Sequence, residues 1–174
     1  MSLTLNNLTQ YHQAVAKGIK TALPNLATVA AYNPVEDQIL KTPAVLLELT
    51  QMEPAESISG GRVSVNLSMA AHVFLAKNGE VDDIQLSIRN LAAYVLQAIH
   101  RNSWGLGGAV GSPKTVEAFP GAFNPESDGY ESWVVQWEQN IYLGAEDQPP
   151  EWLPGEIALN FGYYIGDADG NRAG

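Results

Sequence analysis

The stretch GRVSVNLSMAAHVFLA, residues 61–76, decides the fold because two kinds of side chain alternate along its whole length. One set of alternate positions is apolar: Val63, Val65, Leu67, Met69, Ala71, Val73 and Leu75. The other set is mostly polar or small: Arg62, Ser64, Asn66, Ser68, Ala70, His72 and Phe74. A period of two predicts a β-strand with one buried face. Ordinary strands run for about five or six residues, so we expect a long ribbon that projects beyond its own core and meets another subunit.

The composition is typical of a globular protein with one core. The chain has 174 residues, 45% of them hydrophobic, and it contains no cysteine. The lack of cysteine excludes a disulfide framework and thiolate metal sites. The N-terminus lacks a basic segment followed by an apolar one, and no apolar run reaches the roughly 20 residues that a membrane-spanning helix needs. We therefore expect an intracellular, soluble protein with no membrane partner.

The net charge of -10 lies entirely in the last third of the chain. Residues up to Lys114 include 8 acidic and 8 basic side chains, whereas those beyond it include 11 acidic and 1 basic. Because a nucleic-acid site needs clustered lysine and arginine, we expect no specific nucleic-acid binding. The excess acid serves solubility or marks a surface for a basic protein partner.

The hydrophobic periodicity predicts a helix, two or three strands, a second helix and two or three further strands. The predicted helices are residues 6–23 and about 81–99, and the predicted strands are 28–31, 42–54, 61–76, 115–119 and 131–144. This order predicts an α+β fold, with a mainly antiparallel sheet and two helices packed on one face. We assign residues 1–144 to this domain and residues 145–174, which are acidic and rich in proline and glycine, to a C-terminal arm. One further strand is predicted within the arm, at residues 157–165.

The predicted core joins the ribbon, the second helix and the last strand in one cluster. Its members are Val65, Leu67, Val73, Ile88, Leu91, Val95, Trp133, Val135 and Trp137. The two tryptophans of the last strand are assigned to the core because each buries a large area.

No stretch of the sequence makes a convincing catalytic, cofactor or metal site. The glycine-rich residues 105–111 follow a helix and open none, so they lack the helix N-terminus that would bind a phosphate. Residues 167–171, DADGN, begin like a calcium loop, but the chain ends before the glutamate that such a loop needs. The histidine His72 shares the polar ribbon face with Ser68 and would neighbour Glu48 across the hairpin, which does not amount to a catalytic triad. We therefore expect no enzyme activity and no cofactor.

Several side chains are candidates for contact with another chain. Exposed aromatic residues are favoured at interface hot spots, and the small polar positions of the ribbon offer a smooth surface. The candidate interface residues are Ser64, Asn66, Ser68, Trp104, Trp152, Tyr163 and Tyr164. The loop NSWGLGGAVGSPK, residues 102–114, and the residues around Trp152 are the leading contacts.

Four features together resemble tail-terminator proteins, also called tail-completion proteins, of long-tailed phages and related prophages. They are the N-terminal helix, the segment TPAVLLELTQMEP before the long strand, the helix IQLSIRNLAAYVLQAIHRN followed by a tryptophan, and the closing strand ESWVVQWEQNIYLG. The likeness covers about residues 5–144. The arm beyond Gly144 departs from the shorter members of that family.

The resemblance implies a structural virion protein that works by shape. Tail terminators form a ring, usually a hexamer, on the head-proximal end of the tail tube, where they stop tube polymerisation and present a docking face to the head. The implied partners are further copies of the chain, the tail-tube protein and the head-completion or connector proteins. The implied location is the cytoplasm of a bacterial host and the tail of the assembled virion. The polar ribbon face, with Ser64, Asn66 and Ser68, would border the channel.

Two other classes of protein fit the same pattern. A hot-dog or helix-grip enzyme shares the helix-over-sheet plan and would need a deep apolar cavity beneath the second helix. A small acidic adaptor domain would use the arm to bind a basic partner and would be a stable monomer.

Overall fold

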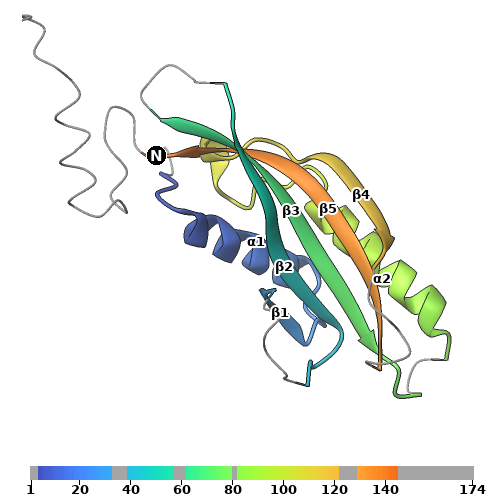
Figure 1. The fold of residues 1–174 in the computed structure, drawn as a ribbon. Coiled ribbons are helices and arrows are strands. Elements are labelled where there is room, and N and C mark those ends of the chain that lie inside the picture. Colours follow the sequence, from blue (N-terminus) through green and yellow to red (C-terminus); the bar gives the residue numbers. More distant parts are fainter. Residues whose placement is uncertain (1–3, 33–38, 57–61, 80–81, 122–128, 145–174) are drawn as a thin grey trace, which may run out of the picture.

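The structure is a computed structural model and describes residues 4–32, 39–56, 62–79, 82–121 and 129–144. Its elements, in chain order, are α1 (Leu8–Ala22), β1 (Thr28–Ala31), β2 (Ala44–Pro54), β3 (Val63–Ala76), α2 (Ile84–Ile99), the short 3-10 helix η1 (Gly107–Ala109), β4 (Lys114–Pro120) and β5 (Tyr130–Leu143). The predicted α+β class is confirmed: in the described ranges one sheet is covered on one side by the two α-helices (Figure 1). The strand predicted at residues 157–165 lies outside the described residues.

The sheet has the strand order β1-β2-β3-β5-β4. All its pairs are antiparallel except β1 with β2, which are parallel and make the sheet mixed. The predicted hairpin of residues 42–54 with the long ribbon is confirmed as the β2–β3 pair.

The long ribbon is the central strand of the sheet, which corrects the prediction that it projects beyond its own core. Strand β3 pairs with β5 from Val63, opposite Leu143, to Ala76, opposite Tyr130. Its other side pairs with β2. Alternation reports which side chains share a face but not which strands lie alongside, and β5 has the same length of 14 residues as β3.

The two helices begin at side-chain caps. The Asn7 side chain accepts a hydrogen bond from the Gln10 backbone N–H at 3.0 Å, and the Gln10 side chain accepts one from the Asn6 N–H at 2.8 Å. Asp83 caps α2 in the same way, accepting from the Leu86 N–H at 3.0 Å. These bonds satisfy N–H groups that have no partner within the helix.

The core lies between the helices and the face of the sheet that they cover. The predicted core residues Val65, Leu67, Val73, Ile88, Val95, Val135 and Trp137 are all buried in one cluster. Leu91 and Trp133 belong to its partly buried margin, because α2 turns Ala92 rather than Leu91 toward the sheet. The assignment of the two faces of β3 and β5 from alternation is therefore confirmed.

Strand β2 contains a β-bulge between Leu49 and Gln51. Before the bulge Leu49 lies opposite Met69, and after it Met52 lies opposite Leu67. Because directly opposed residues share a face, the extra residue keeps both Leu49 and Met52 on the helix-covered side of the sheet. If the same residues paired without the bulge, strict alternation would turn Met52 to the other side.

Candidate assembly surfaces

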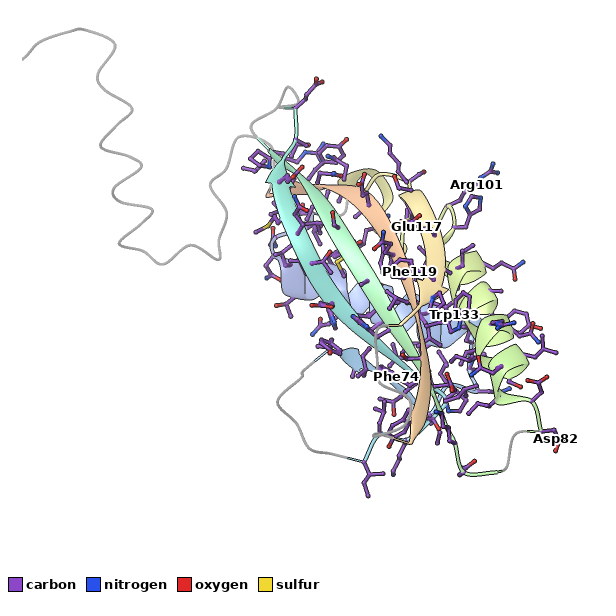
Figure 2. All side chains as sticks on the ribbon, turned by 45° about the vertical axis from the view of Figure 1, so that its right-hand side comes forward. Phe74, Asp82, Arg101, Glu117, Phe119 and Trp133 are labelled. Atoms are coloured by element: carbon purple, nitrogen blue, oxygen red, sulfur yellow. The ribbon has the colours of Figure 1, made fainter. Side chains whose placement is uncertain are left out.

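The face of the sheet away from the helices is open in the described part of the chain, and it runs across β2, β3, β5 and β4 (Figure 2). One half is polar, because Asn66 lies opposite Asn140 and Ser68 lies opposite Glu138. The Ser64 hydroxyl donates to the Asn140 side-chain oxygen at 3.2 Å. The structure thus brings the three candidate residues Ser64, Asn66 and Ser68 together on this face, although Ser64 is itself only 6% exposed.

The other half of the open face is an apolar trough of about 440 Å³. Phe74 and Val134 form its floor and are buried, although no helix covers them. Phe119 of β4, labelled in Figure 2, lines the trough with 38% of its surface exposed. The trough is therefore the apolar part of a surface that is otherwise polar.

The predicted neighbours His72 and Glu48 meet at the edge of this trough. The His72 Nε2 lies 2.7 Å from a Glu48 carboxylate oxygen. The Tyr32 ring stacks on the His72 ring with centroids 4.4 Å apart. Both partners are partly exposed, and surface ion pairs of this kind contribute at most about 1 kcal/mol. The pair fixes one corner of the trough.

Trp104 is buried, which corrects its place among the candidate interface residues. Only 7% of its surface is exposed, and its ring fills a notch at Gly18 of α1, where an added Cβ would lie 2.6 Å from the Trp104 Cε3. The turn after α2 aims the ring inward: Trp104 has φ 57°, and its N–H donates to the Asn102 side chain at 2.8 Å. The glycines of this segment led to the prediction of an exposed loop. The sequence signal for the burial of Trp104 is Gly18 in α1, which leaves room for its ring.

A buried hydrogen-bond hub at Gln139 joins α1, the loop after α2 and β5. Its side-chain oxygen accepts from the Tyr11 hydroxyl at 2.6 Å and from the Trp104 indole N–H at 2.8 Å. Its amide group donates to the backbone carbonyls of Asn102 at 3.0 Å and Gly111 at 2.7 Å. Gln139 alternates with Trp137 and Ile141 on the buried face of β5, and a polar residue at such a position is the sequence signal that could have identified the hub.

The hub holds the loop of residues 102–114 against the sheet. Val110 bridges to Ile141, and the Gly111 N–H donates to the Asn140 carbonyl at 2.8 Å. Burial raises the pKa of the Tyr11 hydroxyl above its ordinary range. The loop exposes glycines and Lys114 but not its tryptophan.

The sheet has two edges that carry no further strand in the described part of the chain. Strand β1 ends beside Leu47, so the outer side of residues 48–54 of β2 is unpaired. Strand β4 forms the opposite edge. The remaining candidate interface residues, Trp152, Tyr163 and Tyr164, lie outside the described residues.

An apolar groove of about 350 Å³ runs beside the unpaired part of β2. The lining residues are Leu8, Thr9, Tyr11, His12, Ala31, Leu49, Leu67 and Met69. Burial lowers the pKa of His12, and its Nε2 is buried without a hydrogen-bond partner among the described residues. The groove thus offers apolar contacts and one unsatisfied polar atom.

Within the described ranges, no group of three or more histidine, aspartate or glutamate residues is placed to hold a metal ion. No helix in those ranges combines the length and the apolar character needed to cross a bilayer.

Neither a protein-family model nor a curated protein matches the chain. A solved structure resembles it with a TM-score of 0.47 and 15% sequence identity, over 80% of this chain and 95% of the other. The name of that protein says nothing of what it does. At this TM-score the likeness supports no argument about family or function.

Proposed function

We propose that the protein is a tail-terminator protein of a long-tailed phage or prophage. It forms a ring, a hexamer by the family resemblance, on the head-proximal end of the tail tube, in the cytoplasm of the bacterial host and then in the virion. The ring ends tube polymerisation and gives the head-completion or connector proteins a docking face. The observation that supports this proposal best is the pair of different edges, on opposite sides of one sheet, that the described residues leave unpaired.

Two different edges suit the contact that a ring requires. In a closed ring each subunit uses one surface to meet a different surface of the next subunit. An unpaired strand edge is a ready template for pairing with another chain. Residues 48–54 of β2 and the outer side of β4 are separated by β3 and β5, so each can engage a different neighbour.

The polar half of the open face suits the wall of a channel through which DNA passes. Its positions on β3 and β5 include Asn66, Ser68, Gln136, Glu138 and Asn140. The cations beside them are Arg62, which lies over the Tyr142 ring, and Lys114, which lies opposite Glu138, so each is separate and has an acidic or aromatic neighbour. Such a wall gives phosphates no cluster of cations to bind. We expect no measurable affinity for duplex DNA at physiological salt, checked by fluorescence anisotropy with a labelled duplex, and tight binding would contradict this placement.

The packing beneath α2 favours this proposal over the enzyme alternative. Ile88, Val95 and Ile99 are each 0% exposed and fill the space between α2 and the sheet. A hot-dog or helix-grip enzyme needs its cavity in that space. The adaptor alternative differs in assembly, because it predicts a stable monomer.

The test is to mix the full chain with tail tubes assembled from the tube protein encoded in the same genome. We expect light scattering to report assembly and electron microscopy to show rings on one end of each tube. Phe119→Lys, which puts a charge at the edge of the trough, should weaken decoration. Tyr94→Lys is the control, since Tyr94 is 57% exposed on α2. A protein that remains monomeric and leaves tube ends bare would contradict the proposal.

A further inference from the structure

The unpaired side of β2 continues for residues 48–54 beyond the end of β1. The last contact between the two strands is the Tyr32 N–H, which donates to the Leu47 carbonyl at 2.8 Å. From there to Pro54, the described residues place no strand on the outer side of β2. This edge is long enough to accept a strand of ordinary length.

Apolar side chains accompany this edge on the helix-covered side of the sheet. Leu49 is 40% exposed and Met52 is 54% exposed, although both lie on the side that forms the core elsewhere. They adjoin the groove that Leu8 and Met69 line and that holds the unpartnered His12 Nε2. A strand added here would bring its own apolar face against these residues.

The chain contains one matching segment outside the described residues. Residues 157–165, IALNFGYYI, carry no charge and alternate with the period of a strand. One set of alternate positions is apolar: Ile157, Leu159, Phe161, Tyr163 and Ile165. The segment therefore offers both an apolar face and a backbone free of proline for pairing with β2.

The chain leaves the sheet near this edge. Leu143 pairs with Val63, and Pro54 pairs with Val65, so β5 and β2 end at the same end of the sheet (Figure 1). Two strand spacings, about 10 Å, separate them.

Residues 145–156, AEDQPPEWLPGE, lie between the sheet and the segment and include three prolines. A proline-rich spacer is extended and semi-rigid at about 3.1 Å per residue. A stiff spacer much longer than the gap that it must bridge lowers the effective concentration of its end on its own molecule. The spacer suits contact with a neighbouring molecule instead.

We propose that residues 157–165 of one copy add as a strand to residues 48–54 of β2 in a second copy, with their apolar positions over Leu49, Met52 and the groove. Backbone hydrogen bonds give this mode of recognition its affinity, and alternate side chains give it specificity. The inference rests on the proposed self-assembly and identifies one of its contacts.

The direct test is disulfide trapping between full-length molecules, which is clean because the chain has no cysteine. Gln51→Cys and Asn160→Cys are made in separately tagged proteins, mixed, oxidised and analysed by mass spectrometry. We expect a mixed dimer. Glu117→Cys, on the opposite edge strand β4, is the matched acceptor control and should give little. If no mixed dimer exceeds this control, the inference is wrong. A third protein carries both substitutions, Gln51→Cys and Asn160→Cys. If it forms a disulfide within one molecule instead, the arm folds back on its own sheet and the inference is also wrong.

A second measurement places a charge at the acceptor edge. Met52→Lys should lower the yield of the mixed dimer about tenfold, the effect of a change near 1.4 kcal/mol. Leu86→Lys is the matched control, because Leu86 on α2 is also 54% exposed. Equal yields from the two variants, with unchanged thermal unfolding, would overturn the assignment of this edge.

The two proposals fail separately. Decorated tube ends without a mixed dimer would refute strand addition and leave the tail-terminator function standing. A mixed dimer with bare tube ends would refute the function and leave strand addition standing.

Discussion

The two faces of β3 have different surroundings, although neighbouring residues of the same strand form them. Leu67 is 0% exposed beneath the helices, whereas Asn66 faces the open side opposite Asn140. The covered face is closed by apolar packing and by the Gln139 hub. On the open face the strands are joined by backbone pairing, but no further layer packs on it in the described structure. Its polar half and its apolar trough are therefore accessible. If the open face serves the proposed assembly, residue parity separates stability from assembly, and substitutions on β3 and β5 should separate in the same way.

The largest effect should come from removing the hub while keeping its volume. Gln139→Leu leaves the Tyr11 hydroxyl and the Trp104 indole N–H buried without an acceptor. Each unsatisfied buried donor costs about 1 to 3 kcal/mol, so the free energy of unfolding should fall by about 4 kcal/mol in urea denaturation. The same change on the open face of the same strand, Gln136→Leu, should alter it by less than about 0.5 kcal/mol. Similar losses in both variants would mean that the two faces do not differ as described.

A smaller loss should follow from a cavity in the covered face. Leu67→Ala should lower the free energy of unfolding by about 3 kcal/mol, because it removes packed atoms that the surroundings cannot replace. Asn66→Ala, one residue away and on the open face, should change it by less than about 0.5 kcal/mol. Thermal unfolding of the pair checks this, and a loss for Asn66→Ala as large as for Leu67→Ala would show that the open face is already part of a core.

The smallest effect concerns pH. Burial raises the pKa of the Tyr11 hydroxyl, so the folded state holds this proton where the unfolded chain releases it, above about pH 10. The contribution of this group to stability is complete below that pH and declines as pH rises, by up to about 1.4 kcal/mol per pH unit. Tyr11→Phe should cost about 1 kcal/mol at neutral pH and should remove this part of the alkaline decline. Parallel pH profiles for the two proteins above pH 10 would contradict it.

The sequence predicted the elements and their faces because both follow from local periodicity. Alternation placed Leu67 and Trp137 inside and Asn66 outside, and turn residues separated the strands of the hairpin. The helix bounds differ by two or three residues at their starts, since Asn7 and Asp83 cap the helices later than their apolar positions suggest.

Local periodicity could not predict the strand order or the conformation of the loop after α2. Both depend on contacts between residues that are distant in the sequence. Nothing local in β3 indicates that β5 pairs along its whole length. The burial of Trp104 depends on Gly18, far away in α1, and on the left-handed turn that Asn102 supports. Among the candidate interface residues, the three polar positions of β3 do share one surface, but on a central strand.

The bulge in β2 has a consequence for comparing this chain with its homologues. The extra residue, Thr50, shifts by one position the alternation of inward and outward side chains in the last few residues of β2. A homologue that lacks it would need a one-residue gap in an alignment there. Because the gap removes the extra residue itself, its equivalents of Gln51 and Met52 would still lie opposite those of Ser68 and Leu67, on the same sides as here. A one-residue deletion at this position should therefore be tolerated, whereas a change that closes the bulge without shortening β2 would turn Met52 to the open face and Glu53 toward the apolar groove.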